Sequence, residues 1–215
     1  MKNLELMIDL EFMGAPPTAA ITAIGAVLID ADTLTIVDRF ETLVSLKSSV
    51  VAGMTMDADT VLWWLAQSDS ARAQFVNNEE QPKLGEALTE FCDWLGMNTQ
   101  WSWVKLSKVW GYGATADNEI MRYAFSRFPG IEQPWTFRED RCFRTFMDGH
   151  DQMWVDYGTA HKAGDDAMAQ ALTLIEVYRA QPGRVIEQIP NPPPMPPMPP
   201  MPDPLFDQFD DDCPF

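Results

Sequence analysis

The first quarter of the chain carries apolar side chains in the pattern of β-strands. Three stretches are rich in apolar and β-branched residues, and short turn-like segments such as Asp30-Ala31-Asp32 separate them; they cover residues 4–10, 19–29 and 34–46. Consecutive strands with short connections pair as antiparallel hairpins. The pattern therefore predicts an antiparallel meander of three strands.

Apolar positions at helical spacing dominate the chain from there to about residue 180. They predict helices over residues 57–67, 83–95, 116–128, 143–147 and 163–178. Asp57 or Asp59 is expected to cap the first of these helices. A further short strand over residues 106–110 ends in Gly111-Tyr112-Gly113. Strands followed by alternating strands and helices indicate an α/β layer fold with a mixed sheet.

The last thirty or so residues change character. Residues 183–204 are rich in proline, which lacks the N–H that helices and sheets need, so this segment is expected to be an extended linker. Residues 205–215 form an acidic, aromatic tip. We therefore expect a folded domain over residues 1–182, followed by this linker and tip as a disordered C-terminal tail.

Composition and charge limit the classes of function. The formal charge of −17 argues against broad electrostatic binding of nucleic acid, although metal ions neutralise acidic clusters and several of the acids lie in the tail. Three cysteines without a C-x-x-C pair indicate neither a disulfide framework nor a zinc site. No apolar run has the length of a signal peptide or membrane span, so the expected location is the cytoplasm.

Candidate chemistry begins with Asp9 and Glu11 on the first predicted strand. Side chains two positions apart on a strand point to the same face, and two carboxylates among apolar neighbours need compensation such as a divalent metal ion. The alternative is a solvated strand edge that carries two surface acids. The pair by itself favours that alternative.

Two further sites carry weaker signals. Asp117 follows a glycine-rich strand end and enters a helix, where α/β sheets place ligands, but the same position suits an acid that stabilises a helix dipole. His161 precedes Asp166 by five residues at a helix entrance. Histidine is the usual general base near neutral pH, yet a lone histidine is most often structural.

Taken together, these sites resemble the motif set of the DEDDh exonucleases, a superfamily with an RNase H-like fold. An early D-x-E, a mid-chain Asp and a late H-x-A-x-x-D occur in the family's order. The resemblance narrows to the phage DexA-type branch, whose relatives include bacterial exoribonucleases, on the segments IDLEFMG, VLWWLAQSDSARAQF, VWGYGATADNEIMR, DRCFRT and HKAGDDAMAQA. It implies an RNase H-like mixed five-stranded sheet flanked by helices.

The resemblance also implies the chemistry. Asp9, Glu11, Asp117 and Asp166 would bind two Mg²⁺ or Mn²⁺ ions, and His161 would deprotonate the attacking water. The products would be nucleoside 5′-monophosphates released from the 3′ end. The chain departs from many members at Phe12-Met13, where a Thr or Ser is common. Backbone amides there are expected to contact the terminal 3′-hydroxyl, with Phe12 or Met13 wedged against the terminal base. Asp165 has no assigned role.

Substrate contacts are predicted from side-chain type and position. One of the adjacent pair Trp63 and Trp64 is expected to stack on a base, with Trp64 the candidate, and the alternative is that both pack in the core. Gln67, one turn later, is expected to reach a phosphate or base edge. Arg141, with Arg144 nearby, is a candidate for phosphate contact, and the alternative is that both form surface ion pairs; Tyr112 is a weaker stacking candidate.

The C-terminal residues resemble the acidic tip of bacterial single-stranded DNA-binding proteins. The matching residues are Asp210, Asp211, Asp212, Pro214 and Phe215, with Cys213 in the apolar position. A terminal Phe ring fills an apolar pocket while the carboxylates meet a basic rim. The implied partners are genome-maintenance proteins that recognise that tip. The alternative is an acidic tail that only improves solubility.

The leading hypothesis is therefore a two-metal 3′→5′ exonuclease that hydrolyses single-stranded DNA, in a bacterial or phage-infected bacterial cell. The DNA expectation depends on the tip. A 3′→5′ exoribonuclease has the same chemistry and is the first alternative. The second is a non-catalytic decoy that binds host repair proteins through the tail, against which the complete set of catalytic residue types counts.

Overall fold

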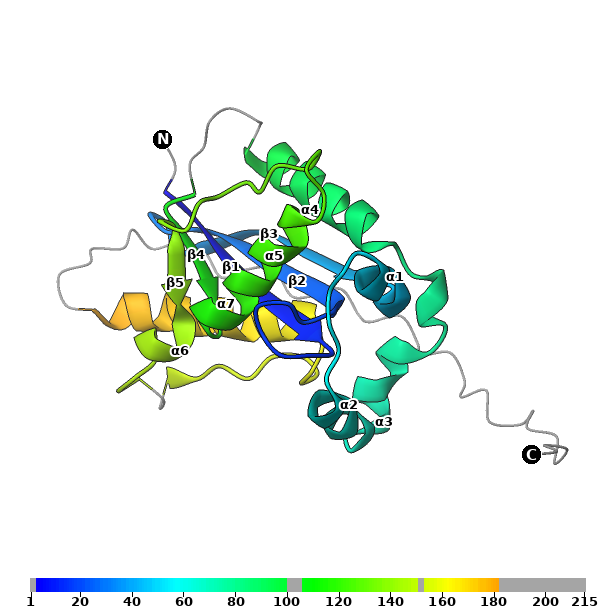
Figure 1. The fold of residues 1–215 in the computed structure, drawn as a ribbon. Helices are drawn as coiled ribbons and strands as arrows, with labels where there is room; N and C mark the ends of the chain where they lie inside the picture. The colour runs from blue at the N-terminus through cyan, green and yellow to red at the C-terminus, as the bar shows by residue number, and fades with distance from the viewer. Residues whose placement is uncertain (1–2, 100–105, 151–152, 182–215) are drawn as a thin grey trace, which may run out of the picture.

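A computed structural model of the protein, which describes residues 3–99, 106–150 and 153–181, has a mixed five-stranded sheet at its centre (Figure 1). The strand order is β3-β2-β1-β4-β5. The first three strands pair antiparallel as the predicted meander, and β4 and β5 run parallel to β1. The strands are β1 (Leu4–Phe12), β2 (Ile21–Asp30), β3 (Thr35–Leu43), β4 (Lys108–Gly111) and β5 (Asp140–Cys142).

The predicted helices are present, and the structure adds several short ones. Asp57 caps α2, since its Oδ1 accepts a hydrogen bond from the Thr60 amide at 3.0 Å. Not predicted were α1, α3 and the 3₁₀ turns η1 and η2. The helices are α1 (Leu46–Val51), α2 (Ala58–Leu65), α3 (Asp69–Arg72), η1 (Ala73–Phe75), η2 (Asn78–Glu80), α4 (Leu84–Thr99), the π-helix η3 (Ala114–Asn118), α5 (Glu119–Ser126), α6 (Phe143–Phe146) and α7 (Ala163–Ala180).

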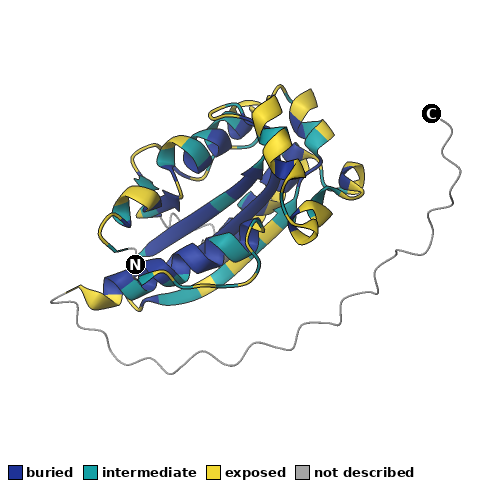
Figure 2. Cartoon of the chain, turned by 90° about the horizontal axis from the view of Figure 1, so that it is seen from below, coloured by how far each residue is buried: buried dark blue, intermediate teal, exposed yellow. Residues whose placement is uncertain are grey.

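Alternation along β1 divides the core into two layers. Even-numbered residues such as Leu6 and Ile8 pack with apolar residues of α4 and α5, whereas Met7 on the opposite face packs with α7. In Figure 2 the middle of the sheet is dark blue, an edge strand is teal and yellow, and the helices on either side have exposed outer faces. β1 is thus a central strand with both faces covered, and only its carboxyl end approaches solvent.

The tail lies outside the residues that the structure describes. This includes the expected domain boundary at residue 182, the linker and the tip residues Asp210, Asp211, Asp212, Pro214 and Phe215. Within the described part, none of the helices has the length and apolar character required to span a bilayer.

Candidate active site

Asp9 and Glu11 lie at the carboxyl end of β1, on the face that α7 covers. Glu11 is only 7% exposed and Asp9 is partly buried. Because β1 has neighbours on both sides, β2 and β4, the alternative of a solvated strand edge is wrong. Two carboxylates are therefore held side by side in a poorly solvated environment, which is unfavourable without compensation.

A glycine at the end of β4 allows Asp117 to approach β1. Gly111 pairs with Ile8, and a Cβ at position 111 would lie 2.9 Å from the Asp117 Cβ. Asp117 sits in η3 and its Oδ1 accepts a hydrogen bond from the Leu10 amide at 3.3 Å. Short π-helical turns of this kind are frequent at functional sites. The strand-to-helix turn thus brings Asp117, as predicted, to the end of β1.

A second glycine lets α7 begin directly over the sheet. Gly25 of β2 pairs with Asp9, and a Cβ there would lie 2.0 Å from the Ala163 carbonyl oxygen. The first turn of α7 consequently carries Asp166 to Glu11. One ligand atom each of Glu11, His161 and Asp166 lie within 4.8 Å of one another. Residues far apart in the sequence therefore converge at one place.

His161 is held in an unusual backbone conformation. Its φ is 63°, in the left-handed region that non-glycine residues rarely occupy. The Asp166 Oδ2 accepts a hydrogen bond from the His161 amide at 2.8 Å, and Gln74 Nε2 donates to the His161 carbonyl at 3.2 Å. The Trp63 ring meets the imidazole edge-on at 5.1 Å. Backbone strain maintained by its surroundings is typical of functional residues.

Asp165 supports the loop before His161. Its Oδ2 accepts a hydrogen bond from the Thr159 amide at 2.9 Å, and its side chain packs against Gly158, whose φ is 61°. The adjacent acids Asp165 and Asp166 therefore both bind backbone amides of the loop that ends in His161. The sequence left the role of Asp165 open, and these contacts give it a position in the loop rather than in the acidic cluster.

The electrostatics of the cluster follow from burial and from repulsion between acids. Burial, followed by the charges of Asp166 and Asp117, raises the pKa of Glu11 to about 8. Burial and then the charges of Asp117, Glu11 and Asp166 raise the pKa of Asp9 well above its ordinary value. Burial also raises the pKa of Asp117, to about 7, and that of Asp166. The folded protein thus gathers four acids whose ionised forms are disfavoured, and the charges of Arg144 on Asp117 and of His161 on Asp166 offset this only in part.

Gln170 is a site residue that the sequence reasoning missed. Its Nε2 donates a hydrogen bond to the Asp9 Oδ1 at 2.6 Å, while its buried Oε1 has no partner among the described residues. Gln170 lies one helical turn after Asp166, so the two side chains share a face of α7. That spacing was the available signal.

The structure revises the predicted stacking residues. Trp64 is 3% exposed and its Nε1 donates to the Phe12 carbonyl at 3.0 Å, so this ring belongs to the core. Trp63 is 46% exposed and lies beside His161. The prediction that one tryptophan is exposed is confirmed, but the choice of Trp64 was wrong. Met13 is also buried, and its amide donates to the Ala20 carbonyl at 2.8 Å, so neither its side chain nor its amide is available to substrate.

The other residues predicted to contact substrate differ in their surroundings: the polar groups of two of them already form hydrogen bonds within the protein. Gln67 Nε2 donates to the Trp63 carbonyl and closes the end of α2. Arg141 Nη1 donates to the carbonyls of Arg138 and Asp140, at 2.9 and 2.7 Å. Tyr112, in contrast, is 38% exposed. Phe12 is partly buried against the core.

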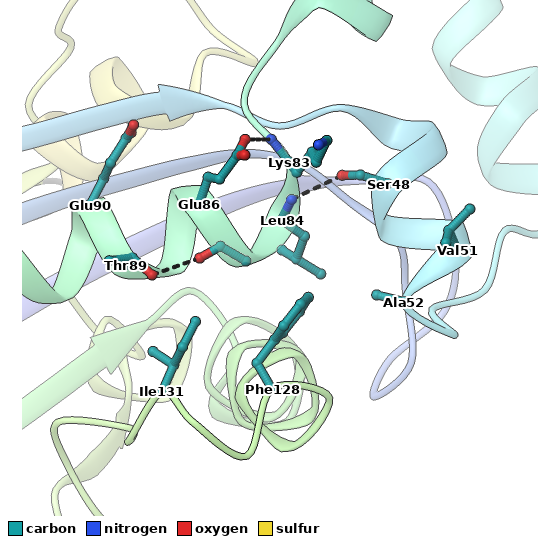
Figure 3. Close-up of a pocket in the computed structure, with 11 residues that line it drawn as sticks. Ser48, Val51, Ala52, Lys83, Leu84, Glu86, Thr89, Glu90, Phe128 and Ile131 are labelled. Atoms are coloured by element: carbon teal, nitrogen blue, oxygen red, sulfur yellow. Dashed lines mark hydrogen bonds between the residues drawn. The ribbon is translucent and has the colours of Figure 1, made fainter.

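A separate apolar groove lies away from the acids. It encloses about 700 Å³ between α1, the first turns of α4 and the segment after α5, with Leu84, Phe128 and Ile131 on its walls (Figure 3). Glu86 at its rim accepts a hydrogen bond from the Lys83 amide and so caps α4. None of the acids at the end of β1 lines this groove.

Comparison with known proteins identifies the family. The model of the 3′-5′ exoribonuclease Rv2179c-like domain matches residues 4–178, which is nearly all of the part that the structure describes. The chain belongs to this family. It is therefore a 3′→5′ exonuclease. No curated protein is significantly similar in sequence.

Three solved structures share the fold of this exonuclease. The nuclease domain of 3'hExo, a DEDDh family member bound to rAMP, is 15% identical, with 83% of this chain and 92% of that chain covered and a TM-score of 0.57. An E. coli ExoI–ssDNA complex in a zinc-bound form is 14% identical, covering 85% and 42%, with a TM-score of 0.57. S. pombe Pop2p, with Mg²⁺ and Mn²⁺ bound, is 14% identical, covering 85% and 86%, with a TM-score of 0.53. These likenesses confirm the RNase H-like sheet. The DexA-type branch depends on the sequence motifs alone.

The acidic cluster of this exonuclease fits divalent metal ions. Its donors are carboxylate oxygens and one imidazole, a set that suits Mg²⁺ or Mn²⁺. Among the described residues, no Lys or Arg forms a salt bridge with Asp9, Glu11, Asp117 or Asp166. Divalent cations would supply the compensation that the raised pKa values show to be missing.

Proposed function

We propose that this exonuclease removes nucleoside 5′-monophosphates from the 3′ end of a single strand, with Asp9, Glu11, Asp117 and Asp166 holding two divalent metal ions. The observation that carries this proposal is the convergence of these acids at the end of β1 without a salt bridge to any Lys or Arg of the described residues. Divalent metal ions held by these residues would stabilise the negative charge that develops on the attacking and the leaving oxygen.

The chain's own side chains supply the remaining chemistry. The imidazole of His161 accepts a proton from the attacking water, whose oxygen bonds to phosphorus as the bond from phosphorus to the 3′-oxygen of the preceding nucleotide breaks. The Asp166 carboxylate orients His161 through its amide, and Gln170 orients Asp9. Trp63 offers a ring beside His161 on which the terminal base stacks.

The sugar of the substrate has two candidates. The description of the family names an exoribonuclease, which favours RNA. Single-stranded DNA is the second candidate, because the tip residues resemble those of single-stranded DNA-binding proteins. We rank RNA first, because the family match covers residues 4–178 and the tip resemblance covers six residues.

The test is digestion of 5′-labelled RNA and DNA strands of the same sequence with Mg²⁺, with Mn²⁺ and with chelator. A ladder that shortens from the 3′ end in metal and stops in chelator supports the reaction. A ratio of kcat/KM above about 10 for one sugar identifies the preferred substrate. Cleavage that continues in chelator, or a product other than 5′-monophosphate, contradicts the proposed chemistry.

The tail has a proposed role of its own. By its resemblance, the tip with Asp210, Asp211, Asp212, Pro214 and Phe215 binds proteins that recognise the single-stranded DNA-binding protein tip. Binding of such a protein to the full chain is compared with binding to a chain lacking Phe215. We expect affinity to fall when the terminal ring and its carboxylate are removed. Equal affinity, or no binding by the full chain, refutes this role.

A further inference from the structure

An exposed aromatic pair lies on the β4 side of the acidic cluster, away from Trp63. Because Ile8 pairs with Gly111, the next residues, Asp9 and Tyr112, lie at the same level of the sheet. Tyr112 is 38% exposed and its ring meets that of Trp154, 42% exposed, at 6.1 Å. The first residues of α7, Ala163 and Gly164, which closely follow His161, lie over β2, the strand on the other side of β1.

Arg144 adds a positive charge to this pair. Its guanidinium lies 4.9 Å from the centre of the Tyr112 ring, and its Nη2 would be 3.9 Å from a Cβ at Gly113. The side chain is exposed and forms no salt bridge with any residue in the described ranges. In a chain with 32 acidic and 15 basic residues, Arg144 is a cation beside the acidic cluster, where its charge lowers the pKa of Asp117, and it is suited to an anionic ligand.

The pair is fixed to the folded core rather than carried on a free loop. The Val155 amide, next to Trp154, donates a hydrogen bond to Thr173 Oγ1 on α7 at 2.9 Å. The rings of Tyr112 and Trp154 both contact Phe143, which is fully buried at the start of α6. A preorganised surface of this kind loses little entropy when a ligand binds.

The geometry of in-line displacement indicates which part of the nucleic-acid substrate would contact this surface. The attacking water and the leaving 3′-oxygen lie on opposite sides of the phosphorus. Since His161 activates the water from the β2 side, the leaving oxygen and the strand attached to it extend toward β4. That strand is the part of the substrate on the 5′ side of the scissile phosphate.

We propose that Tyr112, Arg144 and Trp154 form a binding surface for the part of the strand that lies beyond the first nucleotide on the 5′ side of the scissile phosphate. Arg144 contacts a backbone phosphate, and the two rings stack on bases without regard to sequence. This proposal rests on the proposed function. It explains how a strongly negative chain binds a polyanion, because the contacts are few and lie next to the reaction centre. Substrates too short to reach it do not benefit from it.

The test compares a 12-nucleotide strand with a dinucleotide in Mg²⁺, using the preferred sugar. We expect Arg144→Ala, Tyr112→Ala and Trp154→Ala each to raise KM for the 12-mer about five- to fiftyfold, with kcat changed less than about threefold. The kcat/KM for the dinucleotide should stay within about twofold. Arg144→Ala should also reduce the slope of log Kd against log salt by about 0.7.

Arg138→Ala is the matched control, because Arg138 forms the same kind of contact with the exposed Phe137 ring, at 5.1 Å, but precedes β5 whereas Arg144 follows it. It should leave both substrates unaffected. Equal losses on dinucleotide and 12-mer, or no loss on either, overturn the proposal. Binding of the 12-mer in Ca²⁺, measured by fluorescence anisotropy, distinguishes a failure of the proposed surface from a failure of the proposed function. If the wild type binds but does not cleave, the proposed function fails, and the effect of Arg144→Ala on Kd still decides about the surface.

Discussion

Strand β1 carries buried carboxylates near both of its ends, on the same face of the sheet. The hydrogen-bond partners of these carboxylates differ. Glu5, 1% exposed, accepts hydrogen bonds from Lys108 Nζ at 2.8 Å, Trp110 Nε1 at 2.7 Å and Tyr178 Oη at 3.0 Å. Glu11, 7% exposed, is hydrogen-bonded to no donor among the described residues. One carboxylate has a cation and two neutral donors, whereas the other faces further acids.

The difference separates a structural acid from a ligand-binding acid. A buried carboxylate with a cation and well-placed donors is satisfied within the fold. A buried carboxylate among other carboxylates is satisfied only by something from outside, and here the donor set points to divalent cations. Burial alone does not distinguish Glu5 from Glu11; their partners do.

The largest expected effect comes from an acid of the unpaired set. Asp117→Asn removes one charge with little change of shape, and we expect kcat to fall at least about 10³-fold because the metal ions lose a ligand. Thermal stability should be unchanged or higher, since the substitution reduces repulsion between acids. Activity is measured by digestion of a 5′-labelled strand, and stability by the melting temperature. A kcat within tenfold of wild type would show that Asp117 does not belong to a ligand-binding set of acids.

His161 gives the next effect. Replacement by Asn, which tolerates the left-handed backbone, removes the base and should lower kcat by about 10²–10⁴-fold. His161→Gly, which fits the same φ without strain, should lose as much. Near wild-type kcat in either variant refutes the assignment of the general base. The affinity for a 12-mer in Ca²⁺ serves as the check that the loop is intact.

Glu5 should show the reverse behaviour. Glu5→Ala leaves Trp110 Nε1 and the Tyr178 hydroxyl without their acceptor and Lys108 without its ion pair, and we expect a loss of about 2–4 kcal/mol in the free energy of unfolding. The kcat of the folded fraction should stay within about threefold of wild type. Chemical denaturation followed by activity assays at low temperature measures both. A large loss of kcat with unchanged stability would show that Glu5 belongs to the functional set.

The smallest effect is the dependence of stability on pH. A raised pKa means that the folded protein binds more protons than the unfolded chain, so stability falls as pH rises between the ordinary pKa of Glu11, 4.5, and about 8. We expect the melting temperature in chelator to fall by a few degrees over this window. Mg²⁺ or Mn²⁺ should reverse the fall, because a ligand that binds only the folded state stabilises it. A melting temperature that rises over the same window would contradict the unpaired state of these acids.

The sequence predicted much of this architecture because the pattern of apolar residues is local. The meander, the helices at α2, α4 and α7, and the glycine-rich end of β4 follow from spacing within a few residues. β5 has three residues, too few for a pattern, and it becomes a strand only because β4 offers a free edge. Trp63 and Trp64 are neighbours of the same type, and only packing against Phe75 and Phe12 decides which one is buried.

By itself, the sequence predicted which residues carry the chemistry: Asp9 and Glu11 on an alternating strand, an acid after a glycine turn, and a histidine before an acid at a helix start. Tertiary structure decided which acids remain unpaired, since Glu5 and Glu11 occupy equivalent places in the alternation of one strand. It also placed Gln170 against Asp9, and Arg144 beside Tyr112. The physical reason is that the partner of a buried charge comes from elements distant in the chain, so only the packed fold sets its identity.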